Sequence, residues 1–266
     1  MILGVPVSGF TVREFIDEIL RAAADSRAGH SMFVTYLNAH CANLAVEDPE
    51  YRKILGQANY IYADGQAIIW AASYLGGSLP ERVNAGDFIV DLLRMGAAAS
   101  PPVTFGLAGG RPGVAAAAAL RWRELVPGLS ITSVRDGFEE RDHWTRRDGT
   151  PGGRSDDFSN DEIPDVLLVG MGSPLQETWG WENRDGLGSK VIWCVGALFE
   201  YYGENRRRAP VWMRKIGLEW LVRLVLEPRR LWRRYLVGNL KFCCRIWSAK
   251  RHGDCATTAD RGNRKT

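Results

Sequence analysis

The chain has 266 residues and a mass of 29.6 kDa, a length that fits one large domain or one domain with an appended segment. Apolar residues make up 45% and charged residues 24%, which excludes a long disordered chain, a collagen and a disulfide-rich miniprotein. The five cysteines form no CxxC pair, so neither a structural zinc site nor a secreted disulfide framework is expected. We expect no transmembrane helix and no signal peptide, because no apolar run reaches about 18 residues and no basic region precedes the first one.

The net charge of +3 conceals a division of the chain near residue 205. Residues 1–205 carry 17 basic and 27 acidic side chains, whereas residues 206–251 carry 14 basic side chains and only two acids, Glu219 and Glu227. Such asymmetry indicates a polyanionic partner, either nucleic acid or an anionic membrane surface. We therefore expect a catalytic or binding domain over 1–205, a basic appendage over 206–251 and a flexible tail over 252–266.

Short apolar runs alternate with helical patterns in the first 205 residues. The apolar runs predict strands over residues 32–37, 59–63, 103–107, 129–134, 165–170 and 191–195. The periodic segments predict helices over residues 39–57, 66–75, 87–99 and 114–125. This alternation is typical of crossover units around a parallel sheet, so the sequence predicts an α/β, Rossmann-like fold. Residues 139–164 lack periodicity and predict a flexible surface loop.

Polar or glycine-rich residues follow each predicted strand. Ligands of open parallel sheets bind beyond the carboxyl ends of the strands, so these residues are expected to converge on a site. The alternative is that such loops are polar only because they turn the chain. The residues concerned are Asn38, Asp64, Gly109, Gly110, Asp136, Gly172, Gln176 and Gly196.

Three features of the sequence permit specific chemistry. The glycines of residues 106–113 follow a strand and precede a helix, where backbone N–H groups can bind a phosphate, although glycines also serve tight turns. Asp64 can act as a general base or bind a sugar hydroxyl, or it can cap the helix that follows. Arg82 can recognise a phosphate through its planar fork, or form a surface ion pair.

Several common catalytic patterns are missing from the sequence. No Asp-x-Asp pair occurs that could hold a divalent cation against a diphosphate. Neither a Gly-x-Ser-x-Gly nucleophile elbow nor a His-Glu-x-x-His metal pattern occurs. An enzyme of this sequence that expels a nucleoside diphosphate would therefore stabilise the charge with arginines and helix N-termini.

The basic segment alternates arginines with aromatic and aliphatic residues. Trp212, Ile216, Trp220 and Leu224 lie at helical spacing, and the pattern breaks near Pro228. Helices rich in Lys and Arg with Trp and Leu on the other face are typical of membrane interfaces. The segment therefore predicts contact with a membrane or a polyprenyl phosphate; packing on the domain and nucleic-acid binding are the alternatives.

Taken together, these residues resemble the WecG/TagA/CpsF family of bacterial glycosyltransferases from about residue 30 to about residue 240. Each block of the resemblance is short, and the specificity lies in their order. The blocks include Asp64-Gly65, Leu79-Pro-Glu-Arg82-Val, Gly109-Gly110-Arg-Pro-Gly113, Asp136-Gly137, Gly172-Ser-Pro-Leu-Gln176-Glu177, Arg208-Ala-Pro210 and Glu227-Pro228-Arg229.

The resemblance implies a role for each matched residue. Asp64 would be the general base that deprotonates the acceptor hydroxyl, and Arg82 would neutralise charge on the leaving diphosphate. The predicted substrate-binding residues are Asn38, Gly109, Gly110, Asp136, Gly137, Gly172, Gln176 and Glu177. The predicted acceptor and membrane contacts are Arg208, Arg214, Arg223 and Trp220.

The resemblance also implies an activity. Family members transfer a sugar from a UDP-sugar to a polyprenyl-diphosphate-linked saccharide in surface-polysaccharide assembly, with inversion at the anomeric carbon. They work as peripheral proteins at the cytoplasmic face of the membrane, with no essential metal or other cofactor. A nucleic-acid partner is not implied, and homo-oligomer formation stays open.

One position departs from the family pattern. The family often has Thr-x-Asn at the end of the first strand, whereas here Thr35 precedes Asn38 by three residues. Successive strand side chains face opposite sides, so we expect Asn38 but not Thr35 in the site. The spacing of the 139–164 loop also departs from the family, which bears on the choice of donor sugar.

Two other classes of function stay open at this stage. A membrane-attached sensor could bind a nucleotide sugar without turnover. A nucleic-acid-binding protein could use the 14 basic residues, and its affinity would then fall steeply with salt.

Overall fold

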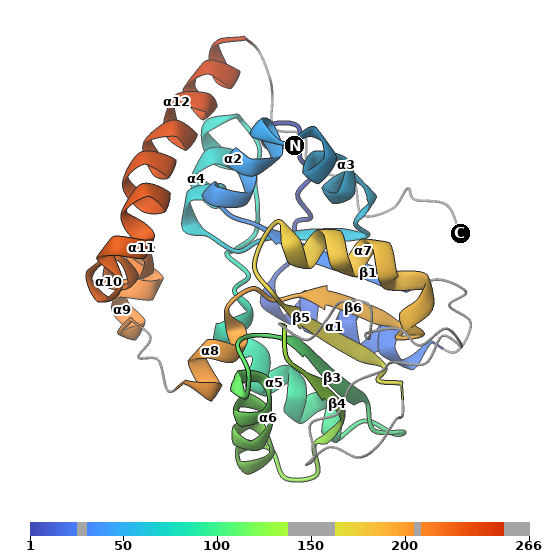
Figure 1. The fold of residues 1–266 in the computed structure, drawn as a ribbon. Helices are drawn as coiled ribbons and strands as arrows, with labels where there is room; N and C mark the ends of the chain where they lie inside the picture. The colour runs from blue at the N-terminus through green and yellow to red at the C-terminus, as the bar shows by residue number, and fades with distance from the viewer. Residues whose placement is uncertain (26–30, 138–162, 205–208, 253–266) are drawn as a thin grey trace. The chain divides into compact units, whose positions relative to one another are not determined.

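The computed structural model describes residues 1–25, 31–137, 163–204 and 209–252. Its strands form one six-stranded parallel sheet in the order β2-β1-β6-β5-β3-β4, with helices around it (Figure 1), so the predicted Rossmann-like α/β fold is confirmed. The strands are β1 (Met32–Leu37), β2 (Tyr60–Ala63), β3 (Thr104–Gly109), β4 (Ser130–Arg135), β5 (Val166–Gly170) and β6 (Val191–Cys194). The predicted loop over 139–164 lies almost wholly outside the described residues.

The chain divides into two compact units, each built from separate stretches of sequence. Unit 1 comprises residues 1–13, 36–84 and 207–266, and unit 2 comprises residues 14–35 and 85–206. The predicted basic segment thus belongs to the same unit as Asp64 and Arg82. The predicted boundary at residue 205 stays a prediction.

Unit 2 holds the larger part of the sheet. Its helices are α1 (Val12–Ala24), which begins in unit 1, and α5 (Ala85–Ala97), α6 (Val114–Leu125), α7 (Leu175–Leu187) and α8 (Leu198–Gly203). On β6, the Trp193 ring packs against Phe15 of α1 and Phe88 of α5, at centroid distances of 5.3 and 6.0 Å. The neighbouring strand residue Ile192 instead meets Gly180 of α7. Helices therefore cover both faces of the sheet, because adjacent strand residues point to opposite sides.

Unit 1 contains β2, the end of β1 and a set of helices. The helices are α2 (Ala39–Glu47), α3 (Pro49–Gln57), α4 (Gln66–Tyr74), α9 (Val211–Lys215), α10 (Glu219–Leu226), α11 (Pro228–Trp232), the π-helical turn η2 (Arg233–Val237) and α12 (Gly238–Arg251). The single helix predicted over residues 39–57 is wrong, because Asp48 and Pro49 divide it. The Asp48 carboxylate accepts the Glu50 and Tyr51 N–H groups and so starts α3, and Pro49 supplies no N–H to continue α2.

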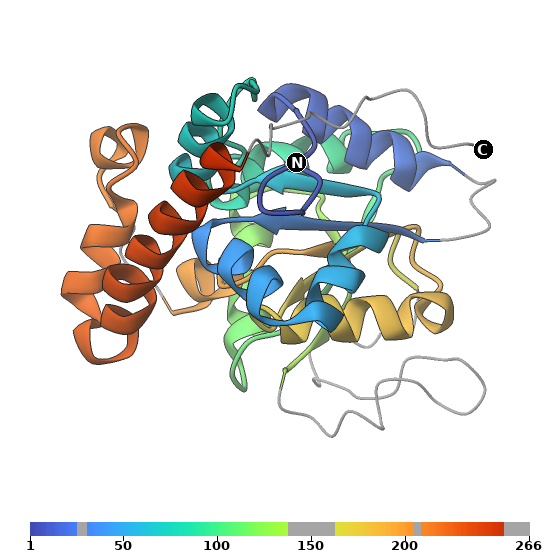
Figure 2. The same cartoon turned by 90° about the horizontal axis from the view of Figure 1, so that it is seen from above.

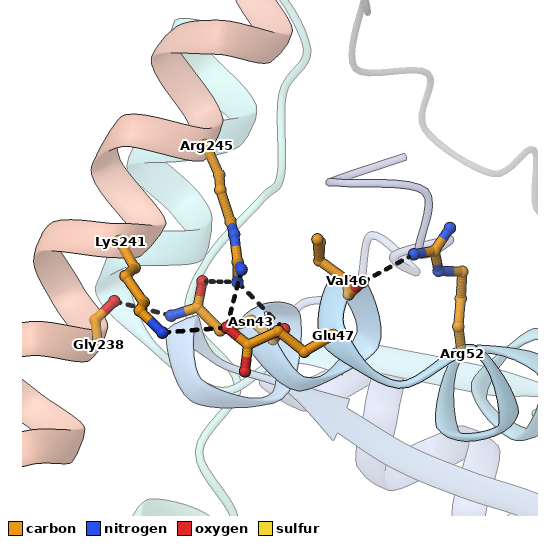
Figure 3. Close-up of polar contacts among 7 residues, drawn as sticks. All are labelled: Asn43, Val46, Glu47, Arg52, Gly238, Lys241 and Arg245. Carbon is orange, nitrogen blue, oxygen red and sulfur yellow. Dashed lines mark hydrogen bonds and ion pairs between the residues drawn. The ribbon is translucent and has the colours of Figure 1, made fainter.

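The C-terminal helix α12 lies along α2 in both views of the fold (Figures 1 and 2). A polar cluster joins the two helices (Figure 3): Asn43 Nδ2 donates to the Gly238 carbonyl at 2.7 Å, and Arg245 Nη1 donates to Asn43 Oδ1 at 2.7 Å. Glu47 pairs with Arg245 at 2.8 Å and with Lys241 at 3.4 Å. We call Asn43, Glu47, Gly238, Lys241 and Arg245 the α2–α12 clamp.

The predicted break of the basic segment near Pro228 is confirmed. α10 ends at Leu226, and Pro228 is the first residue of α11, where a missing N–H has no cost. Within the described ranges, no helix is long and apolar enough to cross a membrane.

Candidate active site

Asp64 lies at the carboxyl end of β2, beside the end of β1. The Asp64 N–H donates to the Leu37 carbonyl at 3.0 Å, which holds the two strand ends together. Asn38 directly follows Leu37, and its side chain hydrogen-bonds to the Asp64 carboxylate. Asn38 Oδ1 also accepts the Cys41 N–H at 3.0 Å and caps α2. The predicted convergence of these two strand ends is therefore present in unit 1.

The loop after α4 brings Arg82 and Asn84 to the same carboxylate. Val83 anchors this loop, because its side chain is buried and its N–H donates to the Ala63 carbonyl at 2.9 Å. Asn84 Nδ2 then donates to Asp64 Oδ1 at 2.7 Å, and the Arg82 guanidinium acts on Asp64 electrostatically.

Helix α10 adds two charges to this cluster. Glu219 begins the helix and Arg223 follows one turn later, so both lie on the same face. Glu219 Oε2 lies 3.8 Å from Arg82 Nη1, and both side chains are only 16% exposed. We call Asn38, Asp64, Arg82, Asn84, Glu219 and Arg223 the Asp64 cluster.

The environment raises the pKa of Asp64 above its ordinary value. Burial is the largest cause, and the negative charge of Glu219 acts in the same direction. Arg82, the Asn38 hydrogen bond and Arg223 oppose it. A carboxylate whose pKa is moved toward neutrality is suited to accept a proton, because the best general base has a pKa near the working pH. The cluster can thus combine proton abstraction with stabilisation of negative charge.

The helix-cap alternative for Asp64 is wrong. The N-cap of α4 is Gly65, and no side chain accepts a hydrogen bond there. The Asp64 carboxylate is directed to Asn84 and Asn38 instead.

In unit 2, three glycine-containing strand ends meet backbone to backbone. A Cβ on Gly109 would collide with the Gly170 carbonyl, and its φ of +129° favours glycine. The Gly110 N–H donates to the Gly170 carbonyl, and the Gly137 N–H donates to the Gly110 carbonyl, both at 2.9 Å. These glycines therefore serve close packing of β3, β4 and β5 at their carboxyl ends.

Asp136 follows β4 and is bound to the glycine loop. Its two oxygens accept the Gly113 N–H at 3.1 and 3.2 Å, and Gly113 is the N-cap of α6. Burial raises the pKa of Asp136, and the Gly113 hydrogen bond opposes the rise. Gly172 follows β5 with a φ of +79° and has open space where a side chain would be.

Gln176 and Glu177 are buried within unit 2. Glu177 Oε1 accepts hydrogen bonds from Ser173 Oγ and Gln176 Nε2 at 2.8 Å, and from Thr35 Oγ1 at 3.0 Å. Gln176 Oε1 accepts the Gly196 N–H at 2.9 Å. The two side chains thus tie the loop after β5 to β1 and to the end of β6. Burial is the main cause that raises the pKa of Glu177.

The other candidates in the basic segment have different surroundings. Arg208 lies outside the described residues. Arg214 Nε donates to the Ala209 carbonyl at 3.1 Å. The Trp220 ring is half-buried and packs against Tyr235, with centroids 6.0 Å apart. The tryptophans of this segment that face solvent are Trp212, Trp232 and Trp247.

Sequence reasoning did not assign roles to Asn84 and Glu219. The one available signal for Asn84 was its position two residues after Arg82 in a segment that follows a predicted helix. For Glu219 there were two signals: it is one of two acids in the basic segment, and it stands in the block Gly217-Leu-Glu219-Trp220, which also resembles the family. Among the residues that the structure describes, no group of three His, Cys, Asp or Glu side chains could hold a metal ion.

The parallel sheet and the Asp64 cluster define a Rossmann-like α/β protein in which a buried carboxylate of raised pKa lies among arginines. The model of the glycosyl transferase WecG/TagA/CpsF family matches residues 1–255. The chain therefore belongs to this family, and it is a glycosyltransferase.

Curated relatives agree with this assignment. An N-acetylglucosaminyldiphosphoundecaprenol N-acetyl-beta-D-mannosaminyltransferase of Staphylococcus aureus strain MRSA252 is 29% identical over 254 residues, which cover 94% of this chain and 92% of the relative. The protein of the same name from strain NCTC 8325 is 28% identical over the same shares of both chains.

Proposed function

We propose that this glycosyltransferase moves a sugar from a UDP-sugar to a polyprenyl-diphosphate-linked saccharide, with inversion at the anomeric carbon and without a metal ion. The observation that carries the proposal is the Asp64 cluster, in which a carboxylate of raised pKa lies beside Asn84, Arg82 and Arg223. The names of the S. aureus relatives, which specify a diphosphoundecaprenol acceptor and a hexosaminyl group, support the acceptor class and the type of sugar.

Asp64 acts as the general base in this proposal. The acceptor hydroxyl oxygen forms a bond to the anomeric carbon of the donor sugar, and its proton passes to the Asp64 carboxylate. The bond from the anomeric carbon to the diphosphate oxygen breaks, and UDP leaves with the electron pair. Asn84 and Asn38 hold the carboxylate in one orientation through their hydrogen bonds.

Arg82 and Arg223 compensate the charge that develops on the diphosphate. Glu219 pairs with Arg82 and keeps the guanidinium next to Asp64. Preorganised positive groups of this kind stabilise a leaving group without reorganising during the reaction. They would replace the divalent cation of a metal-dependent transferase.

The strand ends of unit 2 bind the donor nucleotide. Gly110, Asp136, Gly137 and Gly172 are the proposed contacts, because none of them is fully buried. Gly109, Gln176 and Glu177 are buried and would act indirectly, by holding these loops in place. Arg208, Arg214 and Trp220 stay proposed contacts of the acceptor or the membrane surface, where the enzyme would act as a peripheral protein at the inner face.

The function is tested by UDP release from a panel of UDP-sugars in EDTA, with and without a short-chain polyprenyl-diphosphate saccharide. Acceptor-dependent release with one donor is the expected result. Binding of UDP without release under any condition would contradict the proposed reaction, and a requirement for added metal would contradict the proposed role of the arginines.

A further inference from the structure

Helix α4, which begins two residues after Asp64, exposes two large aromatic side chains. Trp70 is 59% exposed and Tyr74 is 49% exposed, and they lie four residues apart on one face. The opposite face of α4 buries Ile68, Ala71 and Ala72. About half of each of these two side chains therefore faces solvent and not the interior of unit 1.

The two ends of α4 lie against the basic segment. A Cβ on Gly217, in the turn between α9 and α10, would lie only 2.8 Å from Gln66 Cβ and 3.6 Å from the Trp70 ring. At the other end, Lys250 Nζ of α12 lies 6.0 Å from the centroid of the Tyr74 ring. The aromatic face of α4 is thus continuous with exposed side chains of the basic segment.

The helices of the basic segment also expose apolar residues. In α10, Glu219 and Arg223 take part in the Asp64 cluster, whereas Leu221 and Val225, on the opposite face, are exposed. In α12, Phe242, Ile246 and Ala249 are buried, and Leu240 and Trp247 are exposed on the other side. A helix surrounded by water would place its charges outward and its apolar residues inward, so these outer faces fit an apolar neighbour.

Exposed cations accompany the exposed rings. Arg251 Cζ lies 3.7 Å from the centroid of the Trp247 ring, and Arg233 Cζ lies 5.3 Å from that of Trp232. Aromatic rings are enriched at the headgroup level of membranes, and basic residues are attracted to anionic headgroups. Among the basic residues of the segment that the structure describes, the exposed ones are Arg229, Arg230, Arg233, Lys241, Lys250 and Arg251.

We propose that Trp70 and Tyr74 of α4, together with the exposed apolar and basic residues of α9–α12, form one surface that inserts into the headgroup region of an anionic lipid bilayer. This membrane surface rests on the proposed function, in which the enzyme acts at a membrane. It adds that α4, which lies outside the basic segment, also contacts the lipid. The helix after the general base would then lie at the membrane surface, where a lipid-linked acceptor is held.

The test compares three forms of the full chain for binding to phosphatidylcholine vesicles with and without phosphatidylglycerol. These are the unmodified protein, the double variant Trp70→Ser/Tyr74→Ser, and the control Leu120→Ser, which removes a side chain 48% exposed on α6 of unit 2. The double variant is expected to bind anionic vesicles at least roughly tenfold more weakly, because two buried rings are lost. The control is expected to bind as the unmodified protein does.

Equal vesicle binding by the double variant and the control would overturn the proposal. Two other results would also overturn it: dissociation of an oligomer by the double substitution in the absence of lipid, or a fall in affinity for a DNA oligonucleotide in the double variant with vesicle binding unchanged. The first would indicate an interface between copies of the chain, and the second a nucleic-acid site.

A second measurement guards against misfolding of the double variant. Tyr74→Cys, with Cys243, Cys244 and Cys255 replaced by serine, carries an environment-sensitive fluorophore, whose emission is expected to shift to the blue on anionic vesicles. An unchanged emission would overturn the proposal. Turnover of a short-chain soluble acceptor is measured in parallel. Absence of turnover in the unmodified protein would contradict the proposed function, while the vesicle and fluorescence results would still decide the membrane surface.

Discussion

The Asp64 carboxylate takes its properties from residues that are distant in the sequence. Asn38, Asn84 and Arg223 reach it from three different elements of unit 1. Asp64 and Arg82 could be predicted as a pair because both lie in short motifs of the family. The roles of Asn84 and Glu219 could not be predicted, because they depend on a loop and a C-terminal helix that return to the end of β2.

Glu219→Gln is expected to lower the pKa of Asp64. The substitution removes a negative charge that raises this pKa, and it frees Arg82, which lowers it. A base loses activity when it is protonated, so the acid limb of the pH profile of kcat/KM should move to lower pH. Glu227→Gln is the matched control, because it removes the same charge from a residue that pairs with Arg230. An acid limb that stays in place, or moves to higher pH, would contradict this account of the cluster.

Local sequence patterns predict all six strands of the sheet, but they predict the helices less well. The strand predicted over residues 32–37 is β1 itself, and each of the other predicted strands corresponds to an observed one. The prediction of one helix over residues 39–57 is wrong. Apolar periodicity continues across Asp48 and Pro49, but Pro49 has no N–H group with which to continue α2. Helix α7 was missed because the polar start of its sequence, Gln176-Glu177, reads as a loop, although both side chains are buried.

Asn43→Ala is expected to release α12 from α2. Asn43 is buried, and its loss leaves the Gly238 carbonyl and Arg245 without these partners. Each of the two lost hydrogen bonds contributes about 0.5–1.5 kcal/mol, and together they correspond to a roughly 5- to 150-fold larger undocked population. Trypsin should therefore cleave at Lys241 and Arg245 faster. Lys241→Ala removes only an exposed ion pair of the same clamp and should have little effect on cleavage at Arg245. Equal effects of the two substitutions would contradict the dominant role of Asn43.

At the scale of the molecule, the charge division and the two units do not coincide. The acidic part predicted over 1–205 contributes to both units, and the boundaries of unit 1 fall within α1 and within β1. A boundary inside a regular element leaves no proline, glycine or charge signal, so sequence patterns could predict the sheet but not this division. The placement of the basic segment in the unit of Asp64 likewise depends on long-range contacts such as the α2–α12 clamp.

The stability of the protein is expected to fall on mild acidification, partly through His40. Burial, followed by the charge of Arg234, lowers the pKa of His40 to about 4, against the opposing effect of Glu47. The unfolded chain, with a pKa near 6.5, binds more protons between about pH 6.5 and 4, so the free energy of unfolding decreases as the pH falls through this range. His40→Gln removes the titration and should flatten the dependence. Urea midpoints at about pH 7 and pH 5 measure it, and an equally steep decrease in the variant would contradict the assignment to His40.

The central claim, that Asp64 is the general base, is tested most directly by UDP release from Asp64→Asn. The amide keeps the size of the carboxylate and can still hydrogen-bond to Asn84 and Asn38, but it cannot accept the acceptor's proton. We predict turnover lower by about 10²- to 10⁴-fold, with UDP-sugar binding by calorimetry unchanged. Turnover close to that of the unmodified enzyme would contradict the assignment of Asp64 as the base.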